Sequence, residues 1–202
     1  MHKESYEIMQ RFVEQYLDKE KHLEILDVGS YDVNGSYRPL FQHPNWTYTG
    51  LDMAAGPNVD VVSKSAYDFG LDKQFDVVVS GNCLEHVEAP WHWIKEVYKV
   101  TRQGGIVCII TPLSIGEHRY PVDCYRILPD GYRYLLERES EFEIIETKVN
   151  DVPLRKTYNF PIVRNSSKAT CILNVINVFL LRKVAGFNYF PVQDTYAIAR
   201  KK

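Results

Sequence analysis

The chain has 202 residues, of which 45% are apolar, so it can bury the core of a single domain and is not expected to be disordered. The formal net charge of −2 argues against nucleic acid as the main partner, because no broad basic surface is available. The four cysteines form no CxxC pair, which argues against a zinc knuckle or a redox dithiol. The first residues lack an apolar signal region, so we expect a cytoplasmic protein.

The first half of the chain predicts one helix followed by four strands. Apolar side chains recur at helical spacing over residues 6–17. Short apolar runs predict strands at 23–28, 46–51, 59–62 and 75–79, with a short helix near 38–42.

The second half continues the alternation of helices and strands. A helix is expected over 91–100, ended by Gly104 and Gly105, and a strand over 106–110. Pro129 should begin a helix that extends to about residue 137, and strands are expected at 142–149 and 195–199. The pattern predicts an α/β, Rossmann-like fold with a seven-stranded, mostly parallel sheet and helices on both faces.

The segment 151–188 does not fit this alternation within the single domain 1–202. It is long for a connection, so we expect an insertion before the last strand. Its apolar run over 171–181 is too short for a bilayer-spanning helix. Packing on the domain or in a homodimer is favoured over a lid or a surface that contacts lipid.

Acidic residues follow the first two predicted strands. Asp27 and Gly29 end the first strand, and Asp52 ends the second. In a parallel sheet these carboxyl ends share one edge, where α/β domains bind cofactors. A carboxylate can accept hydrogen bonds from an ammonium group or from both hydroxyls of a ribose. Alone, each could be an ordinary turn or helix cap; together they predict a cofactor site.

Five segments occur in a characteristic order and spacing: ILDVG at 25–29, GLD at 50–52, FDVVVS at 75–80, LEHV at 84–87 and the glycine pair at 104–105. In this respect residues 23–112 resemble the class I S-adenosylmethionine-dependent methyltransferases. The resemblance is strongest to the branch with a Leu-Glu-His segment, which acts on small molecules, lipids, quinones and sugars. It implies S-adenosylmethionine as the cofactor.

The resemblance also implies a set of cofactor contacts: Asp27, Gly29, Ser30, Gly35, Asp52, Met53, Ser65, Ala66, Ser80 and Gly81. Asp27 and Gly29 would border the methionine part, with Asp27 holding its amino group. Asp52 would bind the ribose hydroxyls, and Met53 would pack on the adenine.

The other implied contacts lie in later loops. Ser65 and Ala66 would meet the edge of the adenine, with Ser65 in place of the usual acid. Ser80 and Gly81 would offer backbone groups near the methionine part. The loop from Ser30 to Gly35 departs from the family, since side chains replace its closely spaced glycines. The missing Gly-x-Gly-x-x-Gly pattern counts against a nicotinamide dehydrogenase.

Two segments could supply a base for the methyl acceptor. Glu85 and His86 follow the fourth strand, and His86 could act near neutral pH. The alternative that this pair only shapes the cofactor pocket is favoured.

The second segment, residues 117–126, reads EHRYPVDCYR and follows the fifth strand. It resembles a segment of bacterial methyltransferases whose substrates are mostly unassigned. His118 is the first choice for the base, with Asp123 orienting it or binding substrate, and Arg119 or Arg126 could meet an anionic group. The alternative is a salt-bridged loop that caps the sheet. The spacing of His118 and Asp123 is not diagnostic of a metal site, so no metal is predicted.

These observations predict an enzyme that methylates oxygen or nitrogen of a small molecule, with a sugar or glycan precursor suggested by resemblance alone. The first alternative is a regulatory module that binds the cofactor without catalysis. The second is another nucleotide-cofactor enzyme, such as a dehydrogenase.

Overall fold

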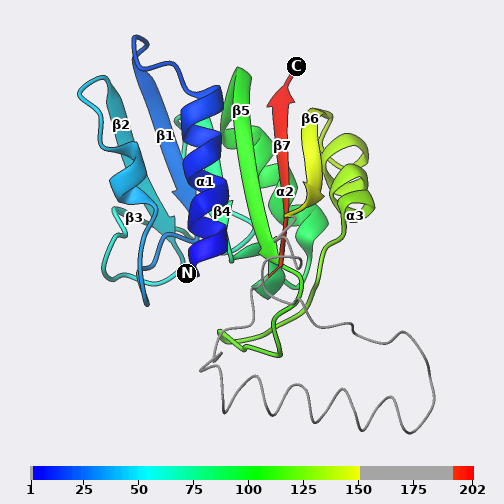
Figure 1. Cartoon of the computed structure of the whole chain (residues 1–202). Coiled ribbons are helices and arrows are strands. Elements are labelled where there is room, and N and C mark those ends of the chain that lie inside the picture. Colours follow the sequence, from blue (N-terminus) through cyan, green and yellow to red (C-terminus); the bar gives the residue numbers. More distant parts are fainter. Residues whose placement is uncertain (1, 151–192) are drawn as a thin grey trace, which may run out of the picture. The chain divides into compact units, whose positions relative to one another are not determined.

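The computed structural model describes residues 2–150 and 193–202, and the expected insertion 151–188 lies outside them. In this part of the chain seven strands form one sheet in the order β3-β2-β1-β4-β5-β7-β6 (Figure 1). They are β1 (Leu23–Val28), β2 (Trp46–Asp52), β3 (Val61–Val62), β4 (Phe75–Gly81), β5 (Thr101–Pro112), β6 (Phe142–Val149) and β7 (Asp194–Lys201). The predicted seven-stranded, mostly parallel sheet is confirmed.

One strand runs against the others. Strand β7 pairs antiparallel with both β5 and β6, whereas β1, β2, β3, β4 and β5 pair in parallel (Figure 1). The last strand of the chain therefore inserts between β5 and β6. The carboxyl ends of the five parallel strands share one edge, which is where the polar side chains at the strand tips gather.

The predicted start of β5 was wrong. The strand begins at Thr101, directly after the helix, and Gly104 and Gly105 lie within it. The register against β4 shifts between Phe75 and Val77, so the glycines accompany a local irregularity of the ladder. A Cβ atom on Gly105 would lie 2.7 Å from the carbonyl oxygen of Arg102, which explains the need for glycine there.

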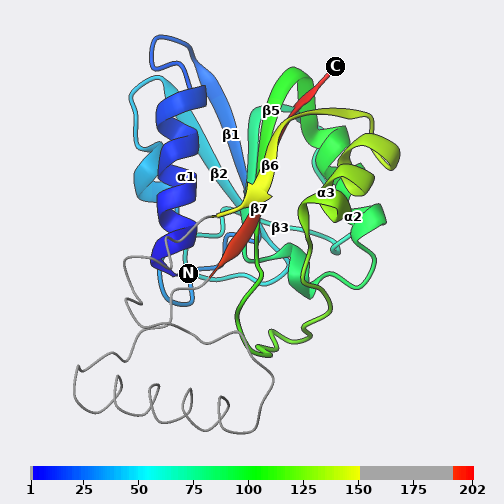
Figure 2. The ribbon, with the colours of Figure 1, turned by 45° about the vertical axis from the view of Figure 1, so that its right-hand side comes forward.

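Helices cover both faces of the sheet (Figures 1 and 2). Helix α1 (Lys3–Tyr16) lies on one face, and α2 (Pro90–Val100) and α3 (Pro129–Arg133) lie on the other. Helix α3 continues as a π-helical turn, η3 (Tyr134–Arg138), so the helix predicted from Pro129 to about 137 is present. Two short 3₁₀ turns, η1 (Arg38–Phe41) and η2 (Leu84–His86), complete the elements described.

Two hydrophobic cores lie on opposite faces of the sheet, and both receive side chains from β4. Val77 and Val79 belong to the cluster that includes Phe12 of α1, and Val78 belongs to the cluster that includes Trp93 of α2. Successive side chains of a strand point to opposite faces, so a run of valines can feed both cores. This double packing makes the central strands a rigid support for the loops at their carboxyl ends.

Candidate functional site

A cavity of about 990 Å³ lies at the carboxyl edge of the sheet. Its walls come from the ends of β1, β2 and β4, from the loops that follow them, and from residues 118–122 after β5. This volume is at the upper end of the range typical of small-molecule and cofactor sites. Nine of the ten cofactor contacts implied by the sequence line it: Asp27, Gly29, Ser30, Gly35, Asp52, Met53, Ser65, Ala66 and Gly81.

Asp27 brings a buried carboxyl group to the wall of the cavity. Its side chain accepts a hydrogen bond from the hydroxyl of Tyr48 on β2. Burial raises the pKa of Asp27 to about 7, and the nearby carboxylate of Asp52 adds to the rise, against the Tyr48 hydrogen bond and the charge of Arg38. A buried carboxylate with this pKa is poised to take a cationic partner, which would favour its charged form.

Gly29 turns the chain at the end of β1 with a φ of +82°, a conformation that side chains disfavour. A Cβ atom there would also lie 2.5 Å from both Cβ and Sγ of Cys83. The turn therefore requires glycine for two reasons, and it lets backbone form the wall of the cavity.

Asp52 occupies the tip of β2. Its carboxylate accepts hydrogen bonds from the backbone N–H groups of Tyr31 and Ala54, each at 3.1 Å. These bonds hold the loop after β1 against the tip of β2. Met53 follows, is 58% exposed and lines the cavity.

The loop between Ser30 and Gly35 is held by hydrogen bonds in place of the glycines that the family favours. The Ser30 hydroxyl donates to the carbonyl oxygen of Asn58 at 3.1 Å, and the Asn58 side chain donates to the carbonyl oxygen of Ser30 at 2.8 Å. The N–H of Gly35 donates to the carboxylate of Asp32 at 2.6 Å. The loop is thus fixed at both ends while its middle lines the cavity.

Ser65 and Ala66 lie on another part of the cavity wall, with Phe69 and Trp93 beside them in the lining. The hydroxyl of Ser65 accepts a hydrogen bond from the N–H of Tyr67 at 3.1 Å. Trp93 is buried and lines the cavity, whereas Trp91 is 42% exposed and does not.

Ser80 is the one implied contact that is not part of the lining. Its hydroxyl is buried and donates a hydrogen bond to the carbonyl oxygen of Val28 at 2.8 Å, which ties β4 to β1. Its neighbour Gly81 does line the cavity.

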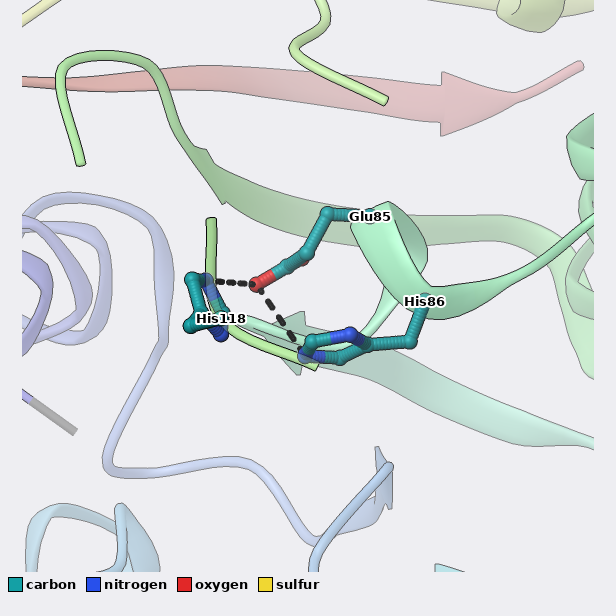
Figure 3. A group of neighbouring side chains, drawn as sticks. All are labelled: Glu85, His86 and His118. Atoms are coloured by element: carbon teal, nitrogen blue, oxygen red, sulfur yellow. Dashed lines mark ion pairs between the residues drawn. The ribbon is translucent and has the colours of Figure 1, made fainter. Parts of the chain in front are cut away.

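At the far side of the lining, Glu85, His86 and His118 converge (Figure 3). One oxygen of Glu85 lies 3.7 Å from Nε2 of His86 and 3.8 Å from Nε2 of His118. The two imidazoles meet edge to face with ring centroids 4.9 Å apart, and both line the cavity. Burial raises the pKa of Glu85 to about 8. Burial and the neighbouring His86 lower the pKa of His118.

Asp123 supports this group from behind. Its carboxylate accepts the backbone N–H of His118 at 2.8 Å and pairs with Arg126 through two hydrogen bonds of 2.5 and 2.7 Å. It therefore positions the chain at His118 and is not bonded to the imidazole itself. Arg119 pairs with the exposed Glu117 at 2.7 Å, so the loop also contains the salt bridges that the alternative interpretation expected.

Sequence reasoning missed three features of the site. Glu85 was weighed only as part of the Glu85-His86 pair, and nothing local places its carboxylate between two histidines that are 32 positions apart. His2 lines the cavity and bonds to both carboxylate oxygens of Asp194 at 2.8 Å, although it precedes the first helix. Tyr37 reaches the cavity and forms a hydrogen bond with Ser5.

Among the residues that the structure describes, no helix has the length and apolar character needed to cross a membrane. This finding concerns the described residues alone and leaves the segment 151–192 aside.

Comparison with known proteins agrees with this geometry. A family model described as a methyltransferase domain matches residues 26–109. An uncharacterized methyltransferase of Mycobacterium sp. (strain KMS) is 30% identical over 102 residues, which cover 46% of this chain and 40% of that protein. The matched stretch thus spans about two fifths of this relative.

Two solved structures share the fold with a TM-score of 0.61. The cyclase SpnF is 17% identical, with 96% of this chain and 80% of that chain covered. The 1,6-didemethyltoxoflavin-N1-methyltransferase of Burkholderia thailandensis, solved with bound 1,6-didemethyltoxoflavin and S-adenosylhomocysteine, is 16% identical, with 98% of this chain and 78% of that chain covered. One of these proteins is named as a methyltransferase and the other as a cyclase, although they share the fold. The activity of this chain must therefore be argued from its site.

Proposed function

We propose that this chain, which carries a methyltransferase domain of the class I, S-adenosylmethionine-dependent kind, transfers a methyl group to oxygen or nitrogen of a small molecule. The observation that carries the proposal is the position of Asp27 and Asp52. Two carboxylates at the tips of neighbouring parallel strands line one cavity. One can meet an ammonium group while the other meets a ribose diol, and S-adenosylmethionine has both groups.

The chemistry of the lining fits this cofactor. Asp27 is a buried carboxyl group with one hydrogen-bond donor, so a cation beside it would supply a missing partner. Gly29 exposes backbone at the turn, and Met53 and Trp93 offer apolar surface to a planar ring. Ser65 and Ala66 would meet the edge of that ring. When bound, the cofactor supplies a methyl group that its sulfonium already makes electrophilic.

The protein's own task is then to align the acceptor and to exclude water. Residues 118–122 form one wall of the cavity, and we assign this wall to the acceptor. The cluster of Glu85, His86 and His118 would activate the acceptor, and Asp123 would hold His118 in position. Trp93 and Val87 are buried and line the cavity, so they would help to exclude water from it.

A hydroxylated acceptor such as a sugar or glycan precursor suits this wall, because it carries hydrogen-bonding and aromatic groups from His118, Arg119 and Tyr120. An amine acceptor would need an unprotonated nitrogen at the same place. A panel of hydroxylated and amine compounds, assayed by the release of S-adenosylhomocysteine, would separate these classes.

Binding of S-adenosylhomocysteine to the full chain tests the proposal. Calorimetry should give one site per chain, weakened by substitution of Asp52. NAD serves as the comparison ligand, since a dehydrogenase would bind it instead and gain thermal stability from it. Absence of S-adenosylhomocysteine binding would overturn the proposal. Binding without turnover of any acceptor in the panel would favour a regulatory module.

A further inference from the structure

Three potential metal ligands from two separate segments meet beside the cavity (Figure 3). Glu85 and His86 come from η2, after β4, and His118 comes from the loop after β5. One ligand atom from each lies within 4.8 Å of the other two. Two imidazoles and one carboxylate form a donor set that suits divalent transition metals.

Glu85 is the observation that points to a ligand. Its side chain is fully buried, and neither carboxylate oxygen has a hydrogen bond from another residue among those described. The imidazole nitrogens at 3.7 and 3.8 Å are too distant for hydrogen bonds. Arg126 donates no hydrogen bond to Glu85, because each of its terminal nitrogens donates to Asp123 and to a backbone carbonyl oxygen, that of Tyr125 or of Gly116. A buried carboxylate is costly in its charged form, so a bound cation at this place would stabilise that form.

The histidines are prepared to act as ligands. Nδ1 of His86 lies 2.6 Å from the carbonyl oxygen of Val122 and must donate to it, because a carbonyl only accepts. The lone pair of neutral His86 is therefore on Nε2, the atom that faces Glu85. Metal-binding histidines commonly donate their second nitrogen to a backbone carbonyl in this way. His118 is held through its backbone N–H by Asp123.

We infer that Glu85, His86 and His118 bind one divalent transition-metal ion such as Zn²⁺, with its open coordination positions toward the cavity. The ligand atoms around a tetrahedral Zn²⁺ lie roughly 3.3–3.6 Å apart, as follows from bond lengths of about 2.0–2.2 Å. The two separations from Glu85, 3.7 and 3.8 Å, would shorten by a few tenths of an ångström, and the two imidazole nitrogens, which lie within 4.8 Å of each other, would also move closer. Because His86 and His118 line the cavity whereas Glu85 lies behind them, the cation would be accessible to a ligand there.

Metal binding itself does not depend on the proposed methyl transfer, but its use does. A cation at this place would accept a lone pair from an acceptor oxygen and lower the pKa of its hydroxyl, so that the proton passes to water. The freed oxygen pair would form the new bond to the methyl carbon, and the sulfur would keep the electrons of the bond that breaks. The cluster would thus act as a ligand set and not as a base.

The test measures metal binding directly on the full chain after treatment with a chelator. Calorimetry with Zn²⁺ should give one site per chain, and Co²⁺ should give visible absorption bands of a low-coordinate site. Glu85→Gln and His118→Ala should each weaken Zn²⁺ by about tenfold or more and remove the Co²⁺ bands. His22→Ala is the matched control, since this exposed histidine lies outside the cavity and should leave both readouts unchanged.

The outcomes separate this inference from the proposed function. No Zn²⁺ binding by the wild type, or binding that Glu85→Gln and His118→Ala leave unchanged, would overturn the metal site. Circular dichroism of the metal-free variants verifies folding, and His118→Asn replaces any variant that fails to fold. S-adenosylhomocysteine is titrated into the same samples. If the wild type does not bind S-adenosylhomocysteine, the proposed cofactor site is refuted, but the result on metal binding remains valid.

Discussion

The hydroxyl of Tyr48 donates a hydrogen bond to the buried carboxyl group of Asp27, across the neighbouring strands β2 and β1. This contact gives Asp27 one donor at a position where the residue is only 2% exposed. The carboxyl group still has a raised pKa of about 7, so the bond compensates its burial only in part. We interpret the remainder as stability given up for a ligand.

Substitution of Asp27 by Asn should stabilise the ligand-free chain and weaken S-adenosylhomocysteine. The folded pKa of about 7 exceeds the unfolded value, so the folded chain holds the extra proton and the free energy of unfolding falls as pH rises from about 4 to 7. Removing the charge should recover roughly 2–4 kcal/mol at pH 8, since one pKa unit corresponds to about 1.4 kcal/mol. Urea unfolding at pH 5 and pH 8 measures this gain.

The same titration should appear in cofactor binding. Wild-type affinity for S-adenosylhomocysteine should fall as pH drops from 8 to 6, because protonated Asp27 no longer attracts an ammonium group. Asp27→Asn should remove this dependence. A pH profile that is identical in the wild type and the variant would contradict the role of Asp27.

Asp52→Ala should weaken S-adenosylhomocysteine by about 1–3 kcal/mol, the range for hydrogen-bonding groups left unpaired. Part of the loss would come from the backbone bonds to Tyr31 and Ala54, which the variant also lacks. Asp52→Asn keeps the shape and one acceptor oxygen, so it should lose less. Unchanged affinity of the alanine variant in calorimetry would remove the assignment to the ribose.

Gly29→Ala should destabilise the fold and weaken the cofactor together. The new Cβ would lie 2.5 Å from Cys83 and would sit on a residue with a φ of +82°. We expect a loss of about 1–3 kcal/mol in the free energy of unfolding, the cost of such backbone strain. Gly116→Ala is the matched control, because nothing lies within 4 Å of its added Cβ, and its melting temperature should match the wild type.

His118→Ala should lower turnover by at least about a hundredfold while changing S-adenosylhomocysteine affinity by no more than about twofold. The imidazole lies on the wall assigned to the acceptor, beside Glu85. Initial rates with the most active compound of the panel and calorimetry on the same sample provide the comparison. An equal loss in both measurements would indicate a structural role for this residue.

Local patterns in the sequence predicted the elements that depend on local physics. The strands β1 and β6 have the expected bounds, since an apolar run ended by a turn residue needs no distant partner to be recognised. Asp27 and Asp52 could be placed at one edge, because consecutive parallel strands have their carboxyl ends on the same side. The resemblance of residues 23–112 then supplied a cofactor for that edge.

Only the tertiary structure decided how distant segments meet. The antiparallel insertion of β7 between β5 and β6 depends on pairing between residues far apart in the chain, which no local period encodes. The meeting of Glu85 with His118 arises because β4 and β5 are neighbours, so the loops after them share one wall. The sequence shows which residue types are present, but side-chain convergence and burial depend on strand order, and these turn an unremarkable Glu-His pair into a candidate metal site.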